Sequence, residues 1–166
     1  MQRMLHYLLN GTLVTIRPIG PEDKGLLAEG LRRLTPETAY KRFLSPKARF
    51  SDAELKYLTE VDGHDHIAYV AVIGDTLVAV GRVVKTAPDT ADLAIVVGDP
   101  WQGLGLGGWL ARLLAAHAAI EGVTRIAGTM LADNRPALRV LKSVSSDIVH
   151  DDLSHGVREI VTRLAA

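Results

Sequence analysis

A dense run of glycines is the part of this sequence best suited to bind a ligand. Residues 101–108 read W-Q-G-L-G-L-G-G and lie between a strand-like segment, 91–97, and a helix-like segment, 107–121. Glycine has no Cβ, so the backbone there can approach a ligand closely. The first amides of a helix have no partner within the helix and bind anions well. The loop therefore predicts a site for a phosphate or pyrophosphate group.

Two spacings of these glycines point to different ligands. Gly103, Gly105 and Gly108 fit the G-x-G-x-x-G pattern of dinucleotide-binding loops, with Asp133 as the acid that would contact a ribose. That pattern needs a tight turn directly after its strand, yet residues 98–102 intervene, and too few residues follow to complete such a fold. A third interpretation is that the glycines serve only a tight turn between the strand and the helix. Two adjacent glycines at a helix start count against it, because glycine lowers the stability of a helix and is unfavourable there unless a ligand approaches the backbone closely.

The other spacing, Q-x-x-G-x-G, uses Gln102, Gly105 and Gly107. With this pattern placed between a strand and a helix, the chain resembles the GNAT superfamily of acyl-CoA-dependent N-acyltransferases. The resemblance includes I-R-P-I-G-P-E-D at residues 16–23 and A-D-N-R-P-A-L-R-V-L at residues 132–141. It implies an α/β (α+β) GNAT fold, in which a mixed, mostly antiparallel central sheet is flanked by helices and its central strands splay apart.

A narrower likeness lies in the first half of the chain. Residues 34–44, 50–55, 58–62 and 66–71 resemble the acetyltransferase domain of bacterial protein lysine acetyltransferases. The broader resemblance to the GNAT superfamily runs, in element order, over residues 12–164. The narrower likeness implies acetyl-CoA as co-substrate and a primary amine, most often a protein lysine, as acceptor. An acyl-CoA synthetase-like enzyme is the partner that this resemblance implies.

The resemblance also implies how acetyl-CoA would lie. Its pantetheine arm would pair like an extra strand with Ile95, Val96 and Val97. Asn134 would contact the arm from the start of the next helix, or serve only as a helix cap. The pyrophosphate would lie on the backbone of the loop residues Gln102, Gly103, Leu104, Gly105, Leu106, Gly107 and Gly108.

Acyl transfer to an amine needs a neutral amine, a donor for the developing oxyanion and a proton for the thiolate. The resemblance assigns the oxyanion donor to the amide of Val97. Asp92 is the candidate base, at a position where relatives carry a glutamate. Because the aspartate side chain is shorter, it favours proton transfer through a bridging water. Alternatively, Asp92 is only a solvated residue at the edge of the strand. Leu141 stands where many relatives carry a tyrosine acid. Either solvent or Ser143 would then protonate the thiolate.

The sequence pattern indicates the elements that would position these groups. Helices are expected to start at 20–23, 35–37, 51–54, 107 and 133–136, and strands are expected at 12–17, 67–73, 76–84, 91–97, 123–130, around 148 and at 157–164. Gly74-Asp75 predicts a hairpin turn. The expected order is β-α-α-α-β-β-β-α-β-α-β-β.

Composition limits the class of protein. The 166 residues predict one domain, 1–166, with 19 basic and 19 acidic residues, so no net charge favours nucleic acid or an anionic membrane. The absence of cysteine excludes disulfides and a cysteine nucleophile. No apolar stretch approaches the ~20 residues of a membrane span, and the first residues do not resemble a secretory signal. A cytoplasmic location is therefore expected.

Other polar groups give weaker signals. Asp62-Gly63-His64-Asp65-His66 could hold a metal ion, but a polar loop is the preferred interpretation and no metal is expected. The basic pairs at 32–33 and 41–42 are interpreted as solvated faces, with the CoA 3′-phosphate as an alternative partner. Trp101 and Trp109 are expected to pack beside the loop.

The function predicted is therefore transfer of an acetyl group from acetyl-CoA to a primary amine, by direct attack in a ternary complex. A small-molecule amine is the alternative acceptor. A CoA-sensing domain that has lost catalysis is the alternative from another class, suggested by Asp92 and by the missing tyrosine at Leu141.

Overall fold

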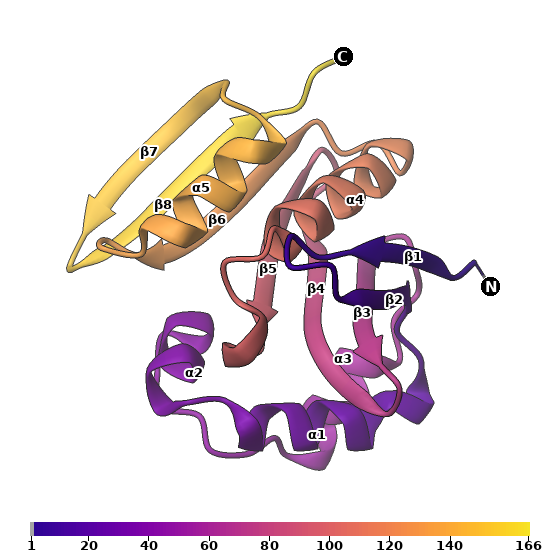
Figure 1. Ribbon diagram of the computed structural model, residues 1–166. Coiled ribbons are helices and arrows are strands. Elements are labelled where there is room, and N and C mark those ends of the chain that lie inside the picture. Colours follow the sequence, from indigo (N-terminus) through magenta and orange to yellow (C-terminus); the bar gives the residue numbers. More distant parts are fainter. Residues whose placement is uncertain (1) are drawn as a thin grey trace.

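A computed structural model describes residues 2–166 and contains eight strands joined in one sheet (Figure 1). The strands are β1 Met4–Tyr7, β2 Leu13–Pro18, β3 His66–Ile73, β4 Thr76–Ala87, β5 Thr90–Val97, β6 Arg125–Leu131, β7 Ile148–Ser154 and β8 Val157–Arg163. The helices are α1 Lys24–Arg33, α2 Pro36–Phe43, α3 Asp52–Thr59, α4 Leu106–Ile120 and α5 Arg135–Val144, with short 3-10 turns at Pro21–Asp23 and Asp99–Trp101.

The strand order is β1-β2-β3-β4-β5-β6-β8-β7, and every neighbouring pair is antiparallel except β5 and β6. The parallel pair is also the one that is paired over the shortest length of strand. Only Thr90, Ala91 and Asp92 of β5 pair with β6, whereas β4 follows β5 as far as Val97. From Leu93 onward, β5 therefore has a neighbour on one side only. The expected mixed sheet with splayed central strands is confirmed.

Helices cover both faces of the sheet. The larger core lies under α4, where Leu106, Leu110 and Leu114 are almost completely buried. Burying a side chain of this size stabilises the fold by about 1.5–3 kcal/mol. A second core lies on the opposite face, where Leu27 of α1 packs on apolar residues of β3 and β4. Because side chains alternate along a strand, Val97 faces α4 and Val96 faces the second core.

The starts of three helices follow the predicted capping chemistry. The Thr35 side chain accepts a hydrogen bond from the amide of Thr38 at the start of α2. Ser51 and Glu54 form the expected capping box of α3, and Asn134 caps α5. The hairpin turn predicted at Gly74-Asp75 joins β3 to β4.

The predicted element order omitted β1, which is a correction. β1 pairs with β2 through a turn in which Gly11 has a φ of 85°. Asn10-Gly11 is a strong hairpin signal, but the strand before it is short, lies at the sheet edge and is half exposed, so its periodicity is weak. Within residues 2–166, no helix is both long and apolar enough to cross a membrane.

Candidate active site

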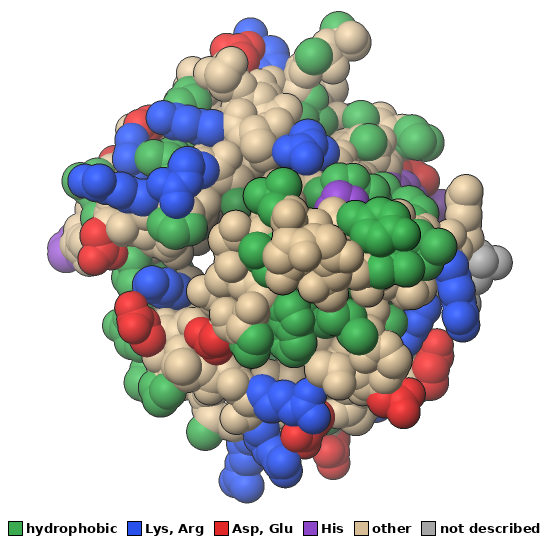
Figure 2. Space-filling model, viewed as in Figure 1, with side chains coloured by type: hydrophobic (Ala, Val, Ile, Leu, Met, Phe, Trp, Pro, Cys, Tyr) green, Lys and Arg blue, Asp and Glu red, His purple; other side chains and the backbone are tan. Residues whose placement is uncertain are grey.

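A cleft of about 1150 Å³ opens where β5 and β6 separate. Its walls are α2 and β5 on one side and β6 and α5 on the other, with the glycine loop and the start of α4 between them. In Figure 2 the surface is hollowed at the corresponding place, between the β6–β8 end of the molecule and the part built by α1 and α2. The cleft thus follows from the splay in the sheet.

The cleft brings together residues that are distant in the sequence. Those predicted from the sequence that line it are Asp92, Ile95, Val96, Val97, Gln102, Gly103, Gly105, Leu106, Gly107, Gly108 and Asn134. Leu104 is the exception in the predicted set. Its carbonyl oxygen accepts a hydrogen bond from the amide of Leu9 at 3.1 Å, and its side chain packs against the larger core. The loop is therefore fastened to the β1–β2 connection at this residue.

The glycine loop presents backbone amides to the cleft. Gly105 precedes α4 with a φ of 87°, a conformation that residues with a Cβ adopt at a cost. The first bond of the helix runs from the amide of Trp109 to the carbonyl of Gly105. The amides of Leu106, Gly107 and Gly108 consequently have no acceptor within the helix. This end of α4 carries the positive end of the helix dipole, which favours an anion.

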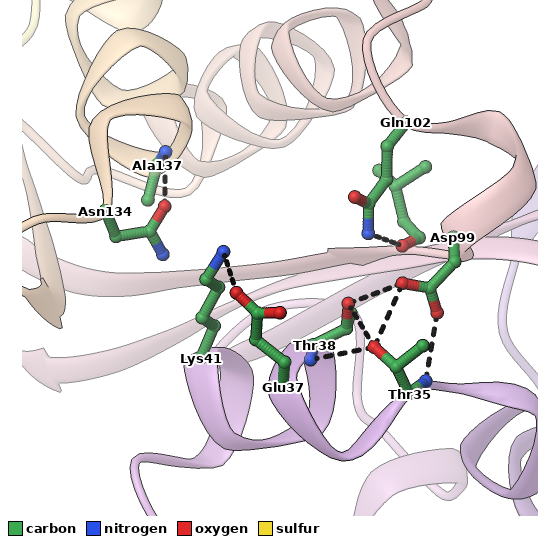
Figure 3. Close-up of polar contacts among 9 residues, drawn as sticks. Thr35, Glu37, Thr38, Lys41, Asp99, Gln102, Asn134 and Ala137 are labelled. Carbon is green, nitrogen blue, oxygen red and sulfur yellow. Dashed lines mark hydrogen bonds and ion pairs between the residues drawn. The ribbon is translucent and has the colours of Figure 1, made fainter.

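Gln102 and Val97 connect the loop to the unpaired part of β5. The side-chain nitrogen Nε2 of Gln102 donates to the carbonyl oxygen of Val97 at 3.0 Å (Figure 3). The next amide, that of Gly98, donates to Val78 of β4 at 2.7 Å. Successive residues of a strand direct their amide and carbonyl groups to opposite sides. The amides of Val97 and Ile95 therefore face the gap that β6 leaves.

Asp92 lies where the splay begins. It is the last residue of β5 that pairs with β6, and its side chain, although accessible to solvent, is partly shielded where it lines the cleft. By strand alternation it lies on the same face as Val96, opposite α4. Partial burial, with a smaller contribution from Glu159, raises the pKa of the Asp92 carboxyl. A raised pKa makes this carboxylate a better proton acceptor.

The residues near the predicted proton donor have other roles. Leu141 is 2% exposed and packs against Gly128 of β6, so it belongs to the core. The hydroxyl of Ser143 lines the cleft but donates to the carbonyl of Val140 at 2.6 Å. Neither arrangement supplies an acid directed into the cleft.

Two arginines of the cleft were not predicted from the sequence. Arg112 of α4 lies about one turn after Gly108, and its Nη1 is 3.2 Å from where a Cβ on Gly108 would be. Arg139 of α5 lines the opposite wall. The i, i+4 spacing of Gly108 and Arg112 was the available signal, because such residues share a helix face. Of the two basic pairs considered as alternative phosphate ligands, Arg32 and Arg33 pair with Glu29 on α1, whereas Lys41 and Arg42 line the cleft.

Helix α2 is fastened to the segment before the glycine loop. Asp99 accepts hydrogen bonds from the Thr35 amide at 3.1 Å and from the Thr38 hydroxyl at 2.6 Å (Figure 3). Burial raises the pKa of Asp99, but the hydrogen bonds from Thr38 and Thr35 outweigh it and lower the pKa overall. These hydrogen bonds between Asp99 and α2, called the clasp below, hold α2 beside β5 and along the cleft.

The polar segment considered for a metal ion has protein partners instead. The carboxylate of Asp62 accepts hydrogen bonds from the amides of His64, Asp65 and His66. His66 Nε2 lies 2.8 Å from Arg82, and His64 pairs with Glu121. Within residues 2–166, no three His, Asp or Glu side chains are grouped so as to hold a metal ion.

Sequence comparison adds independent information about this fold and cleft. The family described as Acetyltransferase (GNAT) family matches residues 31–144. The acetyltransferase Pat of Mycolicibacterium smegmatis is 32% identical over 149 residues, which cover 87% of this chain and 44% of Pat. An acetyltransferase of Pseudomonas aeruginosa is 30% identical over 131 residues, covering 76% of this chain and 70% of that protein.

A solved structure extends the likeness to the whole fold. The GNAT domain of S. lividans PAT superposes with a TM-score of 0.87 at 26% identity, covering 98% of this chain and 97% of that domain. The chain spans less than half the length of the M. smegmatis Pat. The family match, the relatives and the splayed sheet agree with the resemblance found in the sequence. This chain belongs to the GNAT family of acetyltransferases.

Proposed function

We propose that this chain transfers the acetyl group of acetyl-CoA to a primary amine, by direct attack in a ternary complex. The observation that carries the proposal is the gap between β5 and β6, which leaves the Val97 amide unpaired by a strand beside the glycine loop. A thioester bound along β5 would bring its carbonyl to this amide. The loop amides would bind the phosphates at the same time.

The binding of acetyl-CoA divides among three parts of the cleft. The amides from Gln102 to Gly108 would hold the pyrophosphate, with charge from Arg112 and Arg139. The amides of Ile95 and Val97 would pair with the pantetheine arm in the manner of a β-strand. Asn134 has one role already, because its Oδ1 accepts from the Ala137 amide at 3.2 Å. Its side-chain NH₂ group and the second lone pair of Oδ1 are left for the arm.

The chemistry requires the amine to lose a proton and the thioester to cleave. The nitrogen lone pair attacks the acetyl carbon, the carbon–sulfur bond breaks, and CoA leaves as a thiolate. Asp92 would take the proton of the amine directly or through water, and the Val97 amide would stabilise the oxyanion. The thiolate would take its proton from solvent, because Ser143 donates within α5.

We propose a protein lysine as the acceptor. This finer assignment is supported by the similarity to Pat, and an acyl-CoA synthetase-like partner is proposed by the same analogy. A small amine is the alternative acceptor. A CoA sensor without turnover is the alternative function, which the leucine at position 141 and the aspartate at position 92 favour. The cytoplasmic location and the single domain stay predictions.

A calorimetric titration with acetyl-CoA, with NAD as the competing ligand, tests the proposal on the wild type and on Gly105→Glu. We expect the wild type to bind acetyl-CoA but not NAD, and the variant to lose binding. Gly122→Glu is the matched control, because Gly122 has a φ of 90° with open space around it, away from the cleft. Well-folded wild type that does not bind acetyl-CoA would contradict the proposal. Binding without acetyl transfer to any amine would favour the sensor.

A further inference from the structure

An arginine from α2 lines the cleft on the side of the sheet that carries Asp92. Arg42 lines the large cleft and also a small cavity of about 50 Å³ that lies between the α1–α3 helices and the sheet. Arg82 of β4 lines the same small cavity. Arg82 pairs in register with Ala94 of β5, and Asp92 lies two residues before Ala94 on the same face. The two cations and the candidate base therefore share one side of the sheet.

The two arginines differ in what they contact. Arg82 is 5% exposed and contacts the carbonyl of Leu58 at 3.0 Å and Nε2 of His66 at 2.8 Å. Burial, followed by the charge of Arg82, lowers the pKa of His66 to about 4, so this imidazole is neutral and can accept the hydrogen bond. The guanidinium of Arg82 thus has hydrogen-bond partners, but neither partner carries a negative charge.

Arg42 has no anionic partner among residues 2–166. Its guanidinium is partly buried and lies 4.8 Å from the centre of the Phe43 ring. The adjacent Lys41 also lines the cleft but differs, because its ammonium pairs with Glu37 of the same helix (Figure 3). No carboxylate of the described residues forms an ion pair with Arg82 either. Arg42, which lines the cleft, and Arg82, which lines only the adjoining small cavity, consequently carry two positive charges without a counter-charge from residues 2–166.

Burying a cation without a partner is costly, and a guanidinium is shaped to bind a carboxylate through two parallel hydrogen bonds. We infer that Arg42 binds a carboxylate carried by the acceptor close to its reacting amine. This inference rests on the proposed function, because it places the acceptor on the Asp92 side of the sheet. Two sources fit this chemistry: an acidic side chain beside a protein lysine, and the α-carboxylate of a small amino acid.

Matched acceptors separate the two sources. The first pair is a blocked lysine peptide with glutamate or with glutamine beside the lysine. The second pair is free lysine and lysinamide. On wild type, we expect kcat/KM to favour the carboxylate by about 10-fold or more in one pair, the usual size of one charged contact. A preference in the peptide pair identifies an acidic side chain, and a preference in the lysine pair identifies the α-carboxylate.

Variants of Arg42 test whether this residue causes the preference. Arg42→Met should remove it while the KM for acetyl-CoA stays unchanged, and Arg42→Lys should keep part of it. Arg33→Met is the control, because Arg33 pairs with Glu29 at the surface of α1. The inference fails if wild type shows no preference in either pair, or if Arg42→Met keeps it. Melting curves would check that each variant folds.

Equilibrium binding keeps this test independent of turnover. The same two pairs of acceptors are titrated by calorimetry into wild type and Arg42→Met, without acetyl-CoA. Tighter binding of the carboxylate member by wild type alone supports the inference even if no acetyl transfer is measured. Equal binding of both members contradicts it even if transfer proceeds. Failure of acetyl-CoA to bind, by contrast, counts against the proposed function only.

Discussion

The side chain of Gln102 holds the carbonyl of Val97 through a hydrogen bond of 3.0 Å, across the turn that separates β5 from the glycine loop. The contact joins the two parts of the cleft that would hold different ends of acetyl-CoA. It also occupies a carbonyl that β6 would satisfy in a continuous sheet. The Val97 peptide group is thereby held in one orientation with its amide toward the gap.

Removing this contact should weaken both acetyl-CoA binding and turnover. In Gln102→Leu we expect kcat/KM for acetyl-CoA to fall about 10-fold, because one hydrogen bond at the reacting group is worth about 1–1.5 kcal/mol. Gln102→Glu should lose more, since its carboxylate cannot donate and repels phosphate. Steady-state kinetics with calorimetry measure both effects. Wild-type constants in Gln102→Leu would show that the contact has no role in orientation.

The glycine loop and its strand could be predicted from the sequence because their signals are local. A glycine pattern between an apolar strand and a helix predicts a turn. The position of that turn then indicates where the first amides of the helix point. The splay of β5 from β6 came only from the family resemblance. No local pattern in Leu93 to Val97 distinguishes a strand with two neighbours from a strand with one.

Contacts between distant segments could not be predicted in this way. Asp99 and Thr35 are 64 residues apart, and nothing in either neighbourhood indicates their hydrogen bond. Arg42 was interpreted as part of a solvated basic face, because its position inside the cleft depends on how α2 docks beside β5. Charge in the sequence shows that a cation exists, but only the tertiary fold shows whether it has a partner.

The clasp between Asp99 and α2 should be sensitive to pH. Asp99→Ala is expected to cost about 1 kcal/mol of unfolding free energy at pH 7, the net value of a hydrogen bond to a charged group at a partly exposed site. The pKa of Asp99 is lowered in the folded state, so its stabilisation is present above the unfolded pKa and disappears as pH falls through the folded value.

Denaturant unfolding of Asp99→Ala and wild type at pH 7 and at successively lower pH measures this difference. Thr38→Val is the matched partner variant, because it removes the 2.6 Å hydrogen bond and keeps the side-chain shape. The double variant should lose less than the sum of the two single losses. Strict additivity, or a difference that persists below the folded pKa, would contradict a direct clasp.

A buried ion pair anchors the first helix segment to the sheet. Asp23 is 1% exposed and receives both terminal nitrogens of Arg17, each at 2.8 Å, as well as the amide of Gly20. Asp23→Ala should lower the unfolding free energy by about 3–5 kcal/mol, because Arg17 is left without its counter-charge. Thermal and denaturant unfolding measure this loss.

An exposed arginine–aspartate pair that also has two hydrogen bonds provides the control. Asp151 and Arg158 join β7 to β8 through two hydrogen bonds at the surface. Asp151→Ala should change stability only slightly, because water replaces the lost contact. Equal losses in both variants would show that burial does not explain the importance of Asp23.

The role of Asp92 is tested by its pH dependence. Burial raises the pKa of this carboxyl, and only its ionised form can accept the proton of the amine. At saturating acetyl-CoA, kcat/KM for the acceptor should therefore fall as pH drops through this raised pKa. Asp92→Asn should reduce the rate about 10²- to 10⁴-fold and remove the acid limb of the profile. Asp92→Glu restores a carboxylate with a longer reach, so it should keep the acid limb and much of the rate.

Asp133→Asn is the control, because Asp133 is an exposed acid outside the cleft lining, and this variant should retain the wild-type profile. An unchanged acid limb in Asp92→Asn would assign the proton acceptor to another group or to solvent.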